Sequence, residues 1–275
     1  MDGLLIDSED LYTIVTNEVL HEYGKPDLPW HIKAQLQGRP GPEAGRIFRE
    51  WAQLPITESE FLAKQDALKQ KYFPTTQPLP GVPTLLKTLS NTSSPHKVHL
   101  ALATSSNAVN YKLKTGHLQD LFSAFPEGSR VLGDDTRIPK GRGKPAPDIY
   151  LLALETINAR LRWQRSEKEI TPAECLVFED SVPGVEAGRR AGMQVVWCPH
   201  PGLLNEYSGR EKEVLAGIAH LDLNEEEERR KQMDKGDSGT GVEGGREKPG
   251  EVDDGYGRLL QTLEDFPYED YGIRV

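Results

Sequence analysis

The chain has 275 residues, which is enough for one large domain or for a domain with a smaller companion. Its formal net charge of -10 at pH 7 argues against nucleic acid as a partner, because binding a phosphate backbone needs a basic face. Two cysteines, Cys175 and Cys198, stand beside apolar runs without metal-ligand spacing, which indicates buried thiols in a reducing compartment. With no signal-peptide pattern and no run of about 18 apolar residues, we expect a cytoplasmic protein, with the nucleus as an alternative, that is a monomer or weak dimer.

The first elements along the chain are predicted to be helices. Apolar residues at helical spacing begin around Leu11, and similar stripes recur on both sides of a Pro/Gly break at residues 38–42. A second break, rich in proline, covers residues 74–83. The sequence therefore predicts a helical unit over residues 12–78.

Helices and strands then alternate. We expect helices at 82–89, 146–161 and 185–191, and strands at 98–103, 129–133, 175–178 and 194–197. Short apolar strands that alternate with helices are typical of an α/β fold, in which a Rossmann-like parallel sheet carries helices on both faces. Residues 1–11 and 79–224 would form this core, and functional residues should gather at the carboxyl ends of its strands.

The last part of the chain changes in composition. Residues 225–257 have many charges and glycines and almost no large apolar side chains, which predicts a disordered insertion. We expect residues 256–266 to form a final helix that returns to the body, within a C-terminal helix or tail over residues 258–275.

Four short motifs follow predicted strands or open the chain. They are Asp2-Gly3, Thr104-Ser105-Ser106, Gly143-Lys144-Pro145 and Glu179-Asp180. Each has an ordinary structural interpretation: the hydroxyls can cap a helix, the lysine can lie at the surface, and the acids can favour a helix N-terminus. A P-loop is excluded, because proline replaces the Ser/Thr that would bind Mg²⁺.

In this order, the motifs resemble those of the haloacid dehalogenase-like phosphohydrolases with an inserted helical cap. The opening MDGLLIDSE resembles the branch with pseudouridine 5′-phosphatases, glycerol-phosphate phosphatases and sugar-phosphate phosphatases. The resemblance implies Mg²⁺-dependent hydrolysis of a small phosphorylated metabolite (a nucleotide, sugar or polyol phosphate) through an aspartyl-phosphate.

The resemblance also implies residue roles. Asp2 would be the general acid/base, and Thr104 and Lys144 would stabilise the phosphoryl group. Carboxylates would bind Mg²⁺, namely those of Asp2, Glu179 and Asp180. Backbone, hydroxyl and guanidinium groups would bind the substrate, and these belong to Gly3, Ser105, Ser106 and Arg39.

The sequence departs from the family pattern at one point. The nucleophilic Asp of the first motif would stand immediately before Met1, at the end of a buried apolar strand of about five residues. The chain is therefore a non-catalytic relative, a fragment, or a sequence begun at the wrong Met. We expect an upstream start in the native protein and near inactivity of the chain as written. A non-catalytic phosphometabolite-binding protein and a sugar phosphomutase are the alternative functions.

Overall fold

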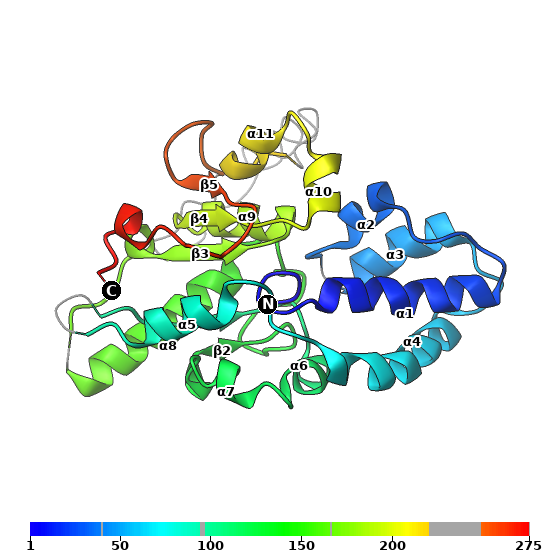
Figure 1. The fold of residues 1–275 in the computed structure, drawn as a ribbon, viewed down its shortest axis with the longest axis horizontal. Helices are drawn as coiled ribbons and strands as arrows, with labels where there is room; N and C mark the ends of the chain where they lie inside the picture. Colours follow the sequence, from blue (N-terminus) through cyan, green and yellow to red (C-terminus); the bar gives the residue numbers. More distant parts are fainter. Residues whose placement is uncertain (40, 94–96, 166, 220–248, 275) are drawn as a thin grey trace, which may run out of the picture.

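The structure is a computed structural model that describes residues 1–39, 41–93, 97–165, 167–219 and 249–274. In Figure 1, helices α1 to α4 gather at one end of the molecule, and the strands with their covering helices form the rest. Helices alternate with parallel strands along the chain, as the α/β class predicted. In the part of the chain that is described, no helix is long and apolar enough to cross a bilayer.

Four helices form the first end of the molecule: α1 (Ser8–Glu22), α2 (Trp30–Leu36), α3 (Gly41–Ala52) and α4 (Glu58–Tyr72). Helix α1 packs on α4 and α2 packs on α3. Leu20, Phe48 and Ala52 form a small buried core among them. Helix α4 begins with a capping box, in which Thr57 and Glu60 satisfy free N–H groups of the first turn. The helical unit expected over residues 12–78 thus consists of helices, although the first begins at Ser8.

The rest of the described chain alternates as expected. Its elements are η1 (Phe73–Thr75), α5 (Val82–Ser90), β1 (Leu102–Ala103), α6 (Ala108–Thr115), α7 (Gln119–Phe122), η2 (Glu127–Ser129), β2 (Arg130–Val131), α8 (Asp148–Gln164), η3 (Pro172–Glu174), β3 (Leu176–Glu179), α9 (Val182–Arg190), β4 (Gln194–Trp197), α10 (Pro201–Glu206), α11 (Glu211–Ala216), β5 (Gly257–Leu259) and η4 (Tyr268–Tyr271).

The strands form two separate parallel sheets. Strand β1 pairs with β2, and Leu102 lies opposite Arg130. Strand β3 pairs with β4, which pairs with β5 on its other edge. Among the described residues, no ladder joins β1 to β3, so the core consists of a two-stranded half and a three-stranded half.

Alternating side chains of the longer strands enter two hydrophobic cores. Val177 and Val195 pack in the core that α8 and α9 cover. Val196, one position further along β4, packs in the core that contains α5 and the C-terminal segment. Because successive side chains of a strand point to opposite faces, this division shows helices on both sides of the sheet, as predicted.

Several predicted elements are confirmed, and one is wrong. The structure contains the predicted strand at residues 194–197 and helices that overlap the predicted ranges 82–89, 146–161 and 185–191. The predicted strand at 98–103 is reduced to Leu102–Ala103. The shortening is consistent with a strand that has a partner on one edge only.

The helix predicted for residues 256–266 does not form. This segment contains the edge strand β5, which pairs with β4 and continues with a hydrogen bond from the Leu260 amide to the Trp197 carbonyl. The edge of β4 that β3 does not cover offers backbone hydrogen-bond partners to this segment. These hydrogen bonds favour a strand over the helix that the spacing of its apolar residues predicts. Most of the predicted disordered insertion, residues 225–248, lies outside the described residues.

Candidate active site between the helical end and the two half-sheets

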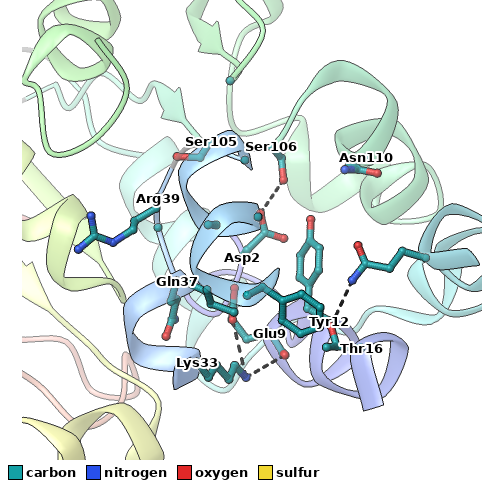
Figure 2. Close-up of a pocket in the computed structure, with 18 of the residues that line it drawn as sticks. Asp2, Glu9, Tyr12, Thr16, Lys33, Gln37, Arg39, Ser105, Ser106 and Asn110 are labelled. Carbon is teal, nitrogen blue, oxygen red and sulfur yellow. Dashed lines mark hydrogen bonds and ion pairs between the residues drawn. The ribbon is translucent and has the colours of Figure 1, made fainter. Parts of the chain in front are cut away.

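A cavity of about 670 Å³ lies between helices α1 to α4 and the carboxyl ends of β1 and β3 (Figure 2). Most of the predicted site residues line it: Asp2, Arg39, Thr104, Ser105, Ser106, Lys144 and Asp180. Gly3 and Glu179 are the two predicted residues that do not. Motifs that are far apart in the sequence therefore meet at one cavity, as expected where parallel strands end.

Asp2 lies at the centre of a polar cluster. Its carboxylate accepts a hydrogen bond from the Ser106 hydroxyl at 2.8 Å, and others from the Ser8 hydroxyl and the Lys114 ammonium. Burial alone would raise the pKa of Asp2, but the charge of Lys114 outweighs it and lowers this pKa to about 2. Asp2 is therefore ionised at neutral pH.

Lys114 was not predicted from the sequence, and it is the cation of this cluster. It lies in the last turn of α6, is fully buried, and donates to the Ser106 hydroxyl at 2.6 Å and to the Tyr12 hydroxyl at 3.2 Å. Burial disfavours its charge, yet the neighbouring Asp2 holds the pKa of Lys114 above its ordinary value. Nothing in the sequence separates it from Lys112, which is exposed on the same helix.

The Thr104–Ser106 turn is built tightly against the β2 side of the core. The Thr104 amide donates to the Val131 carbonyl at 3.0 Å, and the Thr104 hydroxyl accepts from the Ser106 amide at 3.2 Å. Gly133 lies so close that a Cβ there would stand 2.1 Å from the Ser105 carbonyl oxygen. This packing holds the buried hydroxyls of Thr104 and Ser106 at the cavity.

Lys144 belongs to a second polar cluster, at the end of β3. It forms a buried ion pair with Glu179, whose carboxylate also accepts from the Tyr150 hydroxyl and, at 2.9 Å, from the Ser181 hydroxyl. Burial would raise the pKa of Glu179, but Lys144 lowers it below its ordinary value. Glu179 is thus fully occupied within the core, where it positions Lys144.

Asp180 is the carboxylate of the second cluster that reaches the cavity. It accepts a hydrogen bond from the Gln37 side-chain amide at 2.5 Å, which links the core to α2's C-terminal cap. Burial, and then the negative charge of Glu179, raise the pKa of Asp180 to about 8. Its carboxylate also lies beside Gly3, since a Cβ at Gly3 would stand 2.5 Å from Asp180 Oδ2.

The three predicted Mg²⁺ ligands are not gathered into one site. Asp2 pairs with Lys114 and Glu179 pairs with Lys144, whereas Asp180 accepts from the neutral Gln37 amide. Within the described ranges, no three His, Cys, Asp or Glu side chains lie close enough together to hold a metal ion. Mg²⁺ usually keeps several waters and is bound by one or two carboxylates with substrate phosphate, so Asp180 is the carboxylate here that could serve as a ligand without losing a cationic partner.

The helical end contributes its own polar side chains to the cavity. Lys33 donates to the Thr13 hydroxyl at 2.7 Å and to the Glu9 carbonyl at 3.0 Å. Arg39, whose substrate-binding role stays a prediction, pairs with Glu43 at 2.5 Å, and Figure 2 shows its guanidinium directed away from Asp2. Lys33 and Gln37 were not predicted, because both stand in an ordinary amphipathic helical stretch.

Comparisons with known proteins bear on this site. A family model for haloacid dehalogenase-like hydrolases matches residues 1–192. A Saccharomyces cerevisiae protein named "Probable pseudouridine-5'-phosphatase" is 44% identical over 80% of this chain and 89% of its own length. The (DL)-glycerol-3-phosphatase 1 of Arabidopsis thaliana is 33% identical over 82% of this chain and 70% of its own.

Solved structures share the fold. A CbbY mutant from Rhodobacter sphaeroides in complex with xylulose-1,5-bisphosphate superposes with a TM-score of 0.59 at 18% identity, over 97% of this chain and 93% of that one. At this identity the likeness supports the fold alone. The family match, together with the motifs that meet at the cavity, places this chain among the haloacid dehalogenase-like hydrolases.

Proposed function

We propose that this protein is a phosphatase that hydrolyses a small phosphate monoester in the cavity between the helical end and the core. The observation that carries the proposal is the meeting of one buried lysine, two hydroxyls and two carboxylates at this cavity: Lys144, Thr104, Ser106, Asp2 and Asp180. Lys144 and Ser106 line the cavity and are placed to bind phosphoryl oxygens, because ammonium and hydroxyl groups donate strong hydrogen bonds to them. Asp2, ionised at neutral pH, lines the cavity and is placed to accept a hydrogen bond from water.

We further propose a pyrimidine nucleoside 5′-phosphate, such as pseudouridine 5′-phosphate, as the substrate. A cavity of about 670 Å³ exceeds the needs of glycerol phosphate and lies in the ordinary range for small-molecule sites. Its helical end includes the stacked rings of Phe48 and Phe61, which offer an apolar surface to a base. Gln65 and Thr16, hydrogen-bonded to each other at 3.3 Å, offer polar groups for the base edge.

Two parts of the family chemistry stay predictions. The nucleophilic Asp expected before Met1 is not in this chain, so we expect turnover lower by about 10⁵ than that of an intact site. Mg²⁺ would need further oxygen donors beside Asp180, and no step here is assigned to it. The chain's own residues bind the phosphoryl group and orient it.

Calorimetric titration of the full chain tests the proposed substrate. We expect pseudouridine 5′-phosphate to bind, glycerol 3-phosphate to bind more weakly, and unphosphorylated pseudouridine not to bind measurably. Gln65→Ala should weaken binding of the nucleotide about tenfold, as expected for the loss of a hydrogen bond. Gln70→Ala, at an exposed position of the same helix, is the control and should change nothing. Equal affinity for pseudouridine with and without its phosphate would overturn the proposal.

A further inference from the structure

A hydrogen bond joins the helical end of the molecule to Asp180. Gln37, which follows the last residue of α2, donates its side-chain amide to Asp180 Oδ2 at 2.5 Å and is buried at 6% exposure. Both residues line the candidate active site, and Figure 2 shows Gln37 in the cavity wall. Asp180 is also the carboxylate that could bind Mg²⁺ here, so the amide and a cation would use the same group.

The carboxamide of Gln37 is only half satisfied. Its Oε1 atom is buried and has no hydrogen-bond partner among the residues that the structure describes. Asn158, another buried amide, shows the usual arrangement, because it donates to the Ile170 carbonyl at 2.8 Å and accepts from the Ile170 amide at 2.9 Å. A buried acceptor without a partner costs free energy, which offsets much of the hydrogen bond to Asp180. The contact of Gln37 is therefore easier to break than that of an ordinary structural amide.

Asp180 is the fixed side of this contact. The indole N–H of the buried Trp197 donates to the Asp180 carbonyl at 3.0 Å. Gln37 lies at the end of a seven-residue helix and is followed by Gly38, which has a φ of +77°. Gly38 lies so close to Ser181 that a Cβ on it would stand 2.4 Å from Ser181 Oγ. Residues 37–38 thus pack against residues 180–181, and residues 37–38 are the part that can move.

A cation would suit Asp180 better than the amide does. The negative charges of Glu179 and Glu9 act on Asp180, and Gln37 brings a hydrogen-bond donor but no charge. A divalent cation would offset this excess of negative charge. Because Mg²⁺ keeps several waters around it, a cation bound at Oδ2 needs the space that the amide occupies. The amide and the hydrated cation therefore exclude each other.

We propose that Gln37 is a lock on the cation site. In the cation-free protein its amide occupies Asp180, and a divalent cation binds when Gln37 leaves. The lock lowers the affinity for the cation and couples cation binding to the release of residues 37–38 from residues 180–181. The proposal rests on the proposed function in one respect, which is that it places Mg²⁺ at Asp180.

Calorimetric titration of the full chain with Mg²⁺, without any phosphate ester, tests the lock. Gln37→Leu keeps the size of the side chain and removes the amide, so it should tighten Mg²⁺ binding about tenfold. Gln35→Leu, at an exposed position of the same helix, is the control and should stay within about twofold of the unchanged chain. Equal or weaker binding in Gln37→Leu would overturn the proposal, and so would a lack of binding in all three chains.

Amide hydrogen exchange detects the release itself. In the unchanged chain, Mg²⁺ should speed exchange at residues 36–39, because cation binding frees them from Asp180 and Ser181. In Gln37→Leu these amides should exchange fast from the start, and Mg²⁺ should change nothing. Residues 153–158 of the core helix α8 are the reference. Slower or unchanged exchange at residues 36–39 of the unchanged chain on adding Mg²⁺ would contradict the lock.

Two further results separate this proposal from the proposed function. Asp180→Asn should abolish Mg²⁺ binding with or without Gln37→Leu, and binding that survives it would contradict the lock. Tighter Mg²⁺ binding in Gln37→Leu, together with no binding of pseudouridine 5′-phosphate, keeps the lock and contradicts the phosphatase. Binding of the nucleotide, together with equal Mg²⁺ affinity in both chains, keeps the phosphatase and contradicts the lock.

Discussion

Two buried lysines lie near the candidate active site, and they have different surroundings. Lys144, in the segment between β2 and α8, pairs with Glu179 at the end of β3, which is itself buried and bonded to Tyr150 of α8. Every partner in that cluster comes from the α/β core. Lys144 is therefore held by the scaffold, and its charge is balanced before any ligand arrives.

Lys114, in the two-stranded half, depends on another part of the chain. Its carboxylate partner is Asp2, from the N-terminal segment, and the Tyr12 hydroxyl comes from α1 of the helical end. Asp2 retains 15% side-chain exposure, compared with 4% for Glu179. Lys114 itself is fully buried behind Asp2 and does not line the cavity, whereas Lys144 lines it. The comparison indicates that Lys114 acts on the site through Asp2 and Ser106, and that Lys144 faces the cavity directly.

The largest expected effect is on the closed cluster. Lys144→Met leaves the buried Glu179 without a counter-charge, so the free energy of unfolding should fall by about 3–5 kcal/mol. Urea denaturation measures it, and Lys140→Met, at an exposed position nearby, is the control. A loss below about 1 kcal/mol would show that the cluster is not closed as described.

The next largest change in stability is expected where the N-terminal segment packs against Asp180, at the end of β3. Gly3 has a φ of +65° and lies against Asp180, whereas Gly24 has a φ of +66° with open space around it. Gly24→Ala should cost about 1 kcal/mol, from backbone strain alone. Gly3→Ala should cost about 2–3 kcal/mol in thermal or urea unfolding, because it adds a steric clash. Equal costs would contradict the close approach.

The smallest effect compares the helix caps that follow β1 and β3. Ser181 caps α9, is buried, and also donates to Glu179, whereas Asn107 caps α6 at an exposed position. Asn107→Ala should cost about 0.5–1 kcal/mol of unfolding free energy, and Ser181→Ala about 2 kcal/mol. The reverse order would show that the β3 half is not the more closed of the two.

The parts of the fold that the sequence predicted are those fixed by local patterns. Strand β4 lies at residues 194–197 as expected, because a short apolar run between turn signals leaves few alternatives. Residues 256–266 were assigned to a helix because their apolar spacing fits one, and only the free edge of β4 selects a strand there. Pairing with the edge of a distant strand depends on the tertiary structure, so the local spacing of apolar residues does not predict it.

In the candidate site, too, local motifs were predicted from the sequence and tertiary contacts were not. The motifs at Thr104, Lys144 and Asp180 meet at one cavity, because parallel strands bring their carboxyl ends together. The sequence did not indicate that Glu179 turns inward to Lys144, nor that Lys114 reaches Asp2 from the far end of a helix. Both depend on burial and on side-chain direction.

One measurement tests the central claim most directly: calorimetric titration of pseudouridine 5′-phosphate into the Lys114→Met and Lys112→Met variants. Lys114 is buried against Asp2 and Ser106, and Lys112 is exposed two residues away on the same helix. We predict that Lys114→Met weakens binding by about 10- to 100-fold, because it removes the positive charge behind Asp2 and the donor that holds the Ser106 hydroxyl. Lys112→Met should bind within twofold, roughly, of the unchanged chain. Unchanged affinity in Lys114→Met would contradict the assignment of the phosphate site to the β1 half.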